Sequence, residues 1–243
     1  MSSEQIRIGK DADMKLIRQY WKFEECVDGK EMLKKIERAG RTCYKSEDKI
    51  TDDSARQFCL NMLKSGHHSV IEHHNITVRI ITNRGVTHEI VRHRLASYSQ
   101  ESTRYCNYGG DDLVFILPVW MDNYALPLDQ SINADALFIE GPSHLEAPDA
   151  FLYSLYQAEL SYKYLLQEGW QPQCAREVLP NALKTELVMT ANIREWRHFF
   201  SLRCSKAAHP QMRDLAKSML LGFCSNIPAM FDDLYGRFVL RDE

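Results

Sequence analysis

The sequence lacks the glycine motifs that identify most nucleotide-binding proteins and many hydrolases. None of its eleven glycines forms G-x-G-x-x-G, and neither a G-x-x-x-x-G-K phosphate loop nor a G-x-S-x-G nucleophile elbow is present. These absences exclude a Rossmann dinucleotide site, a P-loop and the serine-hydrolase elbow. Any nucleotide must therefore be bound by another device.

Paired cysteines and long apolar runs are missing as well. The seven cysteines are an odd number without a C-x-x-C pair, which disfavours a zinc ribbon, a redox dithiol and a secreted disulfide framework. The longest apolar run, residues 113–120, is about eight residues long and contains a proline, whereas a bilayer span needs ~20. No apolar signal core follows the first methionine. We expect a soluble protein of the reducing cytoplasm that binds no membrane.

Positive charge is absent from one long segment. Residues 105–162 contain no Lys or Arg and nine of the 33 acids, so the rest of the chain holds all 30 basic residues against 24 acids. The formal net charge of −3 therefore conceals a basic body that could face an anion. The low net charge argues against a nucleic acid as partner, but not against small phosphorylated ligands.

The hydrophobic pattern predicts an α+β fold. Helical spacing of apolar residues predicts helices over residues 31–39, 52–66, 86–95, 149–169, 173–179, 194–204 and 210–224. Alternation predicts strands over residues 75–82, 113–117 and 184–191, and residues 97–103 are predicted to form a Ser-rich loop. In the second helix we expect Phe58, Leu60, Met62 and Leu63 to be buried. We predict one domain, 1–243, with an antiparallel or mixed sheet among long amphipathic helices and an irregular acidic excursion at about 107–148.

A histidine-rich stretch, residues 66–74, could suggest a metal site. His67 or His68 with Glu72 and His73 matches no zinc-ligand spacing, and His88 and His93 are five residues apart rather than the four that share a helical face. We predict no metal, and a metal hydrolase is the weaker alternative.

Residues 92–105 combine three arginines with three serines, a threonine and a histidine. If the segment is helical, Arg92 and Arg94 lie ~200° apart, so one of them must point inward or across an interface, where it needs an anion. The Ser/Thr-rich loop supplies hydroxyl and backbone N–H donors for a phosphate. A solvated basic helix followed by a polar loop would explain the same composition.

A third cluster, residues 192–206, places Arg194, Arg197 and His198 on one helical face beside three aromatic residues. Basic groups beside aromatics suit a stacked, phosphorylated ligand. An ordinary amphipathic helix explains the aromatics equally well.

These motifs together resemble one enzyme family. Arg92-His93-Arg94, seven residues and then Ser102 is similar to the R-H-R-x7-S motif of the flavin-dependent thymidylate synthases, and Arg104-Tyr105 extend it. The resemblance runs over about residues 65–213 and includes G-H-x-S-x-x-E-H at 66–73, A-R-x-x-L-P at 175–180, N-x-R at 192–194 and L-R at 202–203.

The resemblance implies a methyltransferase that makes dTMP from dUMP. The carbon would come from methylenetetrahydrofolate and the hydride from NADPH through FAD, without a covalent enzyme nucleophile. It further implies a non-Rossmann flavoprotein that forms a homotetramer with active sites shared between subunits. The alternative from a different class is a non-enzymatic nucleotide- or RNA-binding module that uses the same basic clusters.

The resemblance also implies roles for individual residues. The catalytic residue would be Arg203, which polarises the uracil ring at N3. The dUMP-binding residues would be Glu89, Arg92, Gln100, Glu101, Ser102, Thr103, Arg104, Arg176 and Arg203. The FAD-binding residues would be Ser69, Arg92, His93, Arg94, Gln100, Asn192, Arg194 and His198. Three of these depart from the family's usual residues: Glu89 where Gln is frequent, Gln100 where Glu is frequent, and His198 where Asn is frequent.

Overall fold

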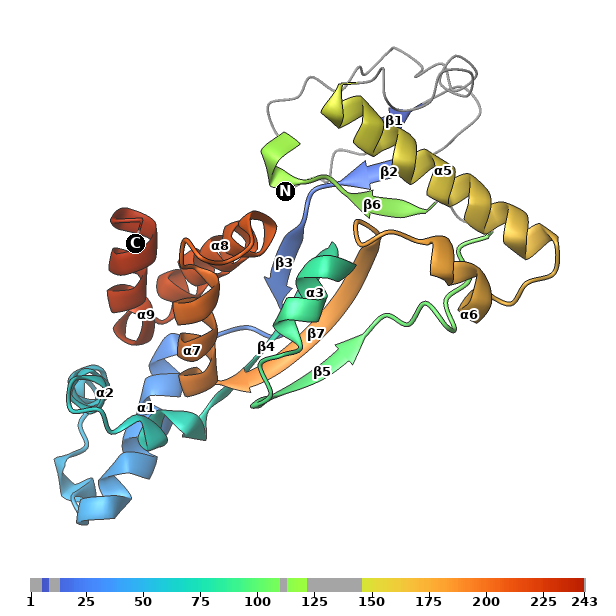
Figure 1. Ribbon diagram of the computed structural model, residues 1–243. Helices are drawn as coiled ribbons and strands as arrows, with labels where there is room; N and C mark the ends of the chain where they lie inside the picture. Colours follow the sequence, from blue (N-terminus) through green and yellow to red (C-terminus); the bar gives the residue numbers. More distant parts are fainter. Residues whose placement is uncertain (1–5, 9–13, 110–112, 122–145, 243) are drawn as a thin grey trace. The chain divides into compact units, whose positions relative to one another are not determined.

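A computed structural model describes residues 6–8, 14–109, 113–121 and 146–242 (Figure 1). Its contacts divide the chain into two compact units. Unit 1 comprises residues 1–20, 81–88 and 100–187, and unit 2 comprises residues 21–80, 89–99 and 188–243. Because the long strands β4 (Asn75–Asn83) and β7 (Lys184–Asn192) pass from one unit to the other, the chain crosses between the units several times.

Unit 1 contains a three-stranded sheet of order β1-β2-β6. Strand β1 (Ile6–Ile8) pairs antiparallel with β2 (Met14–Ile17), and β2 pairs parallel with β6 (Val114–Ile116). The unit also holds α3 (Arg84–Ile90), most of which lies in it, α5 (Ala147–Gln167) and the short α6 (Pro172–Ala175). Its core includes the fully buried Leu16, Phe115, Leu152, Leu155 and Tyr162.

The second sheet has the strand order β3-β4-β7-β5, with β3 at Tyr20–Phe23 and β5 at Ala96–Gln100. The helices of unit 2 are α1 (Gly29–Arg41), α2 (Ser54–Lys64), α7 (Ile193–Arg203), α8 (Pro210–Asn226) and α9 (Pro228–Tyr235), followed by a π-helical turn, η7 (Gly236–Leu240). Figure 1 shows α7 following β7 directly in the chain. The basic residues Arg194, Arg197 and His198 of α7 therefore follow directly after the end of β7.

An aromatic cluster forms the core of unit 2. Trp196, Phe199 and Phe200 of α7 are fully buried and lie against Phe223 of α8 and Phe231 of α9, with ring centroids 5.0–6.0 Å apart. The indole Nε1 of Trp196 donates to the carbonyl oxygen of residue 76 in β4 at 3.1 Å, so the polar end of this side chain is also satisfied. The aromatic residues of the third cluster therefore form core, while its basic residues are left for other contacts.

The predicted α+β class is confirmed, and so are most of the predicted elements. The strands at 75–82 and 184–191 and the helices at 31–39, 149–169, 194–204 and 210–224 lie within two residues of their observed bounds. The expected strand at 113–117 is β6, although residues 110–112 and 122–145 of the acidic excursion lie outside the described residues. The single domain over 1–243 stays a prediction. The N-terminal strands and α9 were not predicted.

Two predictions about local structure are wrong. Helix α3 ends at Ile90 instead of continuing to Leu95, and β5 replaces most of the expected loop. The cause is Tyr98, whose hydroxyl donates to the carbonyl oxygens of Ile90 at 3.0 Å and His93 at 2.7 Å and so satisfies backbone acceptors where α3 ends. In α2 the buried residues are Ala55 and Cys59.

The four side chains expected to be buried in α2, namely Phe58, Leu60, Met62 and Leu63, are only half-buried. Cys59 is one of the buried residues of α2, and desolvation by burial raises the pKa of its thiol to about 12. In the described part of the chain, no helix combines the length and the apolar character that crossing a bilayer requires.

The aromatic cluster predicts a large stability effect. Replacing Phe223 by alanine leaves a cavity among the five aromatic rings that contact it, so we expect the free energy of unfolding to fall by about 3–5 kcal/mol. Urea unfolding followed by circular dichroism measures this change. The matched control is Leu221→Ala on the same helix, where the side chain is 51% exposed and the loss should be below about 1 kcal/mol. Equal losses for the two variants would contradict the assignment of the core.

Candidate active site

The Arg-His-Arg motif lies in the turn between α3 and β5. Arg92 and Arg94 are exposed and His93 is buried, with 5% of its surface accessible. The helical argument that one arginine must point inward is therefore wrong, because this segment is not helical and its histidine takes the inward position. Within the described residues, neither Arg92 nor Arg94 has an ion-pair partner.

The inward-facing histidine is part of a hydrogen-bonded network in unit 2. Its Nδ1 lies 3.1 Å from Oε1 of the buried Glu195 on α7, and its Nε2 accepts from Nε of Arg203 at 3.0 Å. Arg203 also donates from Nη1 to Oε2 of Glu89 at 2.8 Å and from Nη2 to the carbonyl oxygen of Glu89 at 2.9 Å. Arg203, which is expected to be the catalytic residue, is thus held by three acceptors from the end of α3 and the turn after it.

The network defines the protonation of His93. A guanidinium can only donate, so Nε2 must be the unprotonated nitrogen and Nδ1 carries the proton toward Glu195. Desolvation by burial keeps the pKa of His93 below its usual value of 6.5, and the charge of Arg203 lowers it further, while the hydrogen bond and charge of Glu195 act in the opposite direction. The imidazole is therefore neutral in the folded protein at neutral pH.

Ligand atoms of His93, Glu195 and His198 lie within 4.8 Å of one another, which is close enough for three ligands of a metal ion. However, both ring nitrogens of His93 already have partners, and the partner of Nε2 is a cation. A metal ion would have to replace the guanidinium of Arg203. The absence of a metal site stays a prediction.

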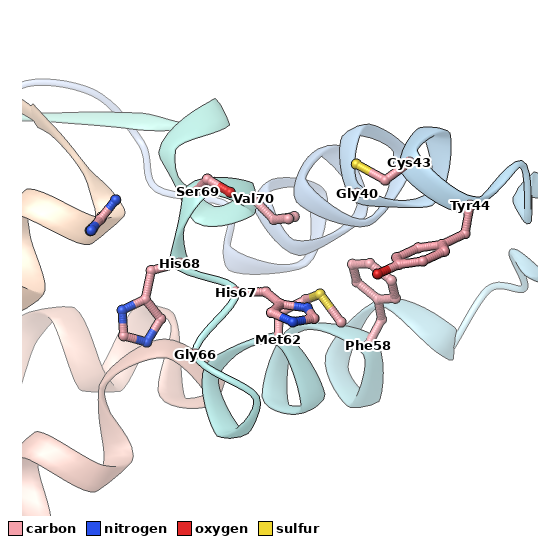
Figure 2. Close-up of a pocket in the computed structure, with 11 residues that line it drawn as sticks. Gly40, Cys43, Tyr44, Phe58, Met62, Gly66, His67, His68, Ser69 and Val70 are labelled. Carbon is pink, nitrogen blue, oxygen red and sulfur yellow. The ribbon is translucent and has the colours of Figure 1, made fainter.

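A pocket of about 460 Å³ lies in unit 2 beside the histidine-rich stretch (Figure 2). It is lined by Gly40, Cys43, Tyr44, Phe58, Met62, Gly66, His67, His68, Ser69, Val70 and Arg194. Figure 2 shows the Tyr44 ring coming from the segment after α1, the Phe58 ring from α2, and Ser69 from the segment after α2. The structure thus brings together Ser69 and Arg194, two residues expected to bind FAD that are 125 positions apart in the sequence.

The walls of this pocket approach each other closely at Gly40. A Cβ atom added there would lie 2.6 Å from Cζ of Phe58 and 2.7 Å from Cγ1 of Val70, so glycine is required by the packing of α1 against both residues. Arg194 donates from Nη1 to Oε1 of Glu72 at 2.6 Å, and both side chains are substantially exposed. The pocket therefore combines a rigid, partly aromatic wall with a solvent-accessible cation.

This donor set fits a phosphorylated cofactor. Arg194 can donate to a phosphate, Ser69 offers a hydroxyl, and His67 and His68 offer ring nitrogens. The volume lies in the range of about 300–1,000 Å³ that is usual for small-molecule pockets. The remaining FAD candidates of unit 2 lie on or near α7: Asn192 caps this helix, accepting from the backbone N–H of residue 195 at 2.9 Å, and His198 is exposed, with its ring centroid 5.6 Å from that of His93.

The other predicted dUMP residues form a second group, in unit 1. Gln100 donates from Nε2 to the hydroxyls of Thr87 at 3.0 Å and Thr185 at 3.2 Å. Nη1 of Arg176 donates to the hydroxyl of Thr103 at 3.1 Å, so these two candidates are in contact. The arrangement anchors the start of the loop 100–104 on β7 and its middle on the segment after α6.

Both carboxylate oxygens of Glu101 accept hydrogen bonds from neighbouring side chains. Its Oε1 accepts from the Tyr108 hydroxyl at 2.7 Å and its Oε2 from Nζ of Lys184 at 3.0 Å. Desolvation and the bond to Glu101 raise the pKa of Tyr108 far above its usual range, so the phenol remains a hydrogen-bond donor. The side chain of Glu101 therefore braces the loop, with one donor bonded to each of its carboxylate oxygens.

Ser102 and Arg104 lie at the exposed end of the same loop. The Ser102 hydroxyl accepts from the backbone N–H of residue 104 at 3.3 Å, and no general base is bonded to it among the described residues. The Arg104 guanidinium lies 5.5 Å from the centre of the Tyr105 ring, which is 80% exposed. Ser102 is thus not activated as a nucleophile, whereas Arg104 is accessible to a phosphate.

Sequence reasoning missed Glu195, Tyr108 and Lys184 as members of these networks. The spacing Asn192-x-x-Glu195 is typical of a helix cap, and that signal predicts a capping role rather than a bond to a histidine 102 residues away. Tyr108 and Lys184 have no local signal, because their shared partner becomes visible only when β5 and β7 lie in one sheet.

Both groups combine arginines with hydroxyl groups, and these donors suit small phosphorylated ligands without a glycine-rich loop. Comparison with known proteins gives the family. The family described as "Thymidylate synthase complementing protein" matches residues 27–229. The chain belongs to this family, that of the flavin-dependent thymidylate synthases.

Similar proteins are named flavin-dependent thymidylate synthase in several bacteria. The protein of Geobacter sulfurreducens is 32% identical over 202 residues, which cover 80% of this chain and 78% of that protein. The protein of Corynebacterium aurimucosum is 33% identical over 220 residues, covering 88% and 84%. The protein of Mycobacterium tuberculosis is 35% identical over 209 residues, covering 82% and 78%.

The His93 network predicts a specific titration. Because the folded chain holds His93 neutral and the unfolded chain protonates it near pH 6.5, this residue stabilises the fold above that pH and its contribution is lost as the pH falls below it. We expect nitrogen NMR to find the proton on Nδ1 at pH 7 and a titration midpoint below 6.5. Replacing Arg203 by methionine removes a nearby positive charge and should raise this midpoint. A midpoint above 6.5 in the unaltered protein would contradict the network.

Proposed function

We propose that this chain catalyses the reductive methylation of dUMP to dTMP and is thus a methyltransferase of nucleotide biosynthesis. The carbon comes from methylenetetrahydrofolate and the reducing equivalents come from NADPH. Family membership over most of the chain supports this reaction. No observation on the described residues favours the alternative of a non-enzymatic RNA-binding module.

The observation that carries the proposal is the placement of Arg203. Of its five N–H donors, three are held by His93 and Glu89, which leaves one N–H on each terminal nitrogen. A guanidinium held in this way can donate to the uracil ring and stabilise the negative charge that develops there, without reorganising. Arg203 is half-buried, so this charge acts where water is partly excluded.

Each unit contains residues that are proposed to bind the nucleotide. In unit 2 these are Glu89, Arg92 and Arg203. In unit 1 these are Gln100, Glu101, Ser102, Thr103, Arg104 and Arg176. In that loop Arg104 and Arg176 supply positive charge and Ser102 and Thr103 supply hydroxyls for the phosphate, while Glu101 and Gln100 hold the loop in place through Lys184 and Thr185.

FAD is proposed to be held by Ser69, Arg92, His93, Arg94, Gln100, Asn192, Arg194 and His198. When bound, FAD supplies the hydride-transfer chemistry that no protein side chain can provide. The chain contributes the pocket beside Ser69, where the pyrophosphate would meet Arg194, and the exposed guanidinium groups of Arg92 and Arg94. No covalent attack by the enzyme is proposed. Among the residues that the structure describes, no base is bonded to Ser102, and burial raises the pKa of Cys59 and Cys204 to about 12.

We further propose a homotetramer with shared active sites, located in the cytoplasm. Leu95, which directly follows Arg94, is 76% exposed, so a second copy of the chain could cover the leucine and supply partners or bound phosphate for Arg92 and Arg94. All seven cysteines are free, as a reducing compartment requires.

The first test concerns Arg203. The purified protein should be yellow and should form dTMP from dUMP in the presence of FAD, methylenetetrahydrofolate and NADPH. Replacing Arg203 by alanine should lower kcat at least about a hundredfold, since one preorganised donor contributes about 10²–10³, and should leave the flavin spectrum visible. Arg56→Ala, which removes an exposed arginine of α2, is the control and should keep full activity. Normal turnover by the Arg203 variant would exclude the catalytic assignment, and salt-sensitive RNA binding without NADPH oxidation would favour the alternative.

The second test concerns the pocket. Replacing Arg194 by alanine removes a charge-assisted hydrogen bond of about 1.5–3 kcal/mol, so FAD should bind about ten- to a hundredfold more weakly. Titration of the flavin-free protein with FAD, followed by flavin fluorescence, gives the dissociation constant. An unchanged constant would show that Arg194 does not contact the cofactor.

A further inference from the structure

Glu195 is buried in a way that its position in the helix does not explain. It is the third residue of α7, and its backbone N–H donates to the capping side chain of Asn192 at 2.9 Å. Glu31 has the same position in α1, with its N–H bonded to the capping Asp28 at 3.1 Å. The Glu31 side chain remains 59% exposed, whereas only 6% of the Glu195 side chain is exposed.

The buried carboxylate faces His93. Transferring a charged group from water costs free energy unless it is paired and hydrogen-bonded, and the contact between Oε1 of Glu195 and Nδ1 of His93 at 3.1 Å provides this pairing. An ionised carboxylate can only accept, so it holds the imidazole proton on Nδ1. Nε2 is then free to accept from Nε of Arg203 at 3.0 Å.

The opposite tautomer would break this contact. With the proton on Nε2, two N–H donors would face each other across the 3.0 Å between His93 and Arg203, and the guanidinium would lose the acceptor for its Nε edge. The contacts with Glu89 hold only the two terminal nitrogens. The orientation of Arg203 therefore depends on the proton of His93 as well as on Glu89.

We propose that Glu195 is a positioning residue that fixes the tautomer of His93 and, through it, the guanidinium of Arg203. The proposal rests on the function proposed above for Arg203, and it gives His93 a structural task in addition to its proposed place beside the cofactor. Glu195 is assigned no contact with the substrate. It acts through a chain of two hydrogen bonds, from Glu195 to His93 and from His93 to Arg203.

The proposal has a consequence for the pH dependence of turnover. The titratable and charged groups that face His93 are Glu195, His198 and Arg203 from α7, and the Tyr98 hydroxyl of β5 bonds its backbone oxygen. Protonation of His93 would remove the acceptor for Arg203, so kcat should fall on the acid side. Removing the charge of Glu195 makes protonation of His93 harder and should shift this acid limb to lower pH.

The experiment is steady-state kinetics on the flavin-loaded Glu195→Gln variant, which keeps the side chain's size and removes its charge. We expect kcat to fall at least about tenfold, because displacements of about 1 Å cost up to a hundredfold, while KM for dUMP changes less than about threefold. The acid limb should move down, and nitrogen NMR should find the His93 proton partly on Nε2. In a His93→Ala background the same substitution should have little further effect on kcat.

The control is Glu31→Gln, which removes the same charge from the same position of α1. It should leave kcat and the acid limb unchanged, so any effect of helix capping or of the helix dipole is separated from the effect on His93. Unchanged kcat in Glu195→Gln, or an equal loss with and without His93, would overturn the proposal.

Failure of the proposed function has a different outcome. If the unaltered protein forms no dTMP, the function is wrong whatever the variants do. The NMR spectra of His93 and of Arg203 Nε in flavin-free protein still test the positioning. Tautomer and Arg203 signals that are identical in Glu195→Gln and in the unaltered protein would overturn it independently of activity.

Discussion

The candidate site depends on satisfying one half-buried guanidinium. Arg203 ends α7, and a cation in this place needs acceptors that water supplies only in part. The chain meets this demand with the last turn of α3 and the residues that follow it: Glu89 gives a carboxylate and a carbonyl oxygen, and His93 gives a ring nitrogen. The side chain of Arg203 thereby joins α7 to the end of α3 and to the turn that follows α3.

This requirement explains why α3 is short. If the helix continued to Leu95, His93 would be part of its regular turns and the carbonyl oxygen of Ile90 would accept a helical bond from the backbone N–H of residue 94. Ending the helix at Ile90 turns His93 toward α7 and leaves Arg92 and Arg94 outside. The Tyr98 hydroxyl bonds two carbonyl oxygens of the segment that ends the helix, and burial raises the pKa of this phenol to about 12, so it stays protonated and able to donate.

The sequence predicts elements better than it predicts contacts. Periodicity identified β4, β7, α5, α7 and α8 because each buries a regular stripe of apolar residues. Periodicity failed between Val86 and Leu95. The apolar spacing there suits a helix, but the helix ends at Ile90, whose carbonyl oxygen accepts from the hydroxyl of Tyr98. The motif residues of the site could be named in advance, yet the partner of His93 could not. Glu195 is 102 positions away, and its local spacing is fully accounted for by helix capping.

Among the described residues, some cations of the candidate site are paired with carboxylates and others are not. Arg203 is paired with Glu89, Lys184 with Glu101, and Arg194 with Glu72. Arg92 and Arg94 have no such partner there, although they flank the buried histidine of the network. Because a paired cation offers less to a ligand than an unpaired one, these two arginines, like Arg104, gain more from a phosphate than the paired cations do. The buried members of the network thus hold one another in place, and its exposed neighbours Arg92 and Arg94 are left with charges that an added anion could neutralise.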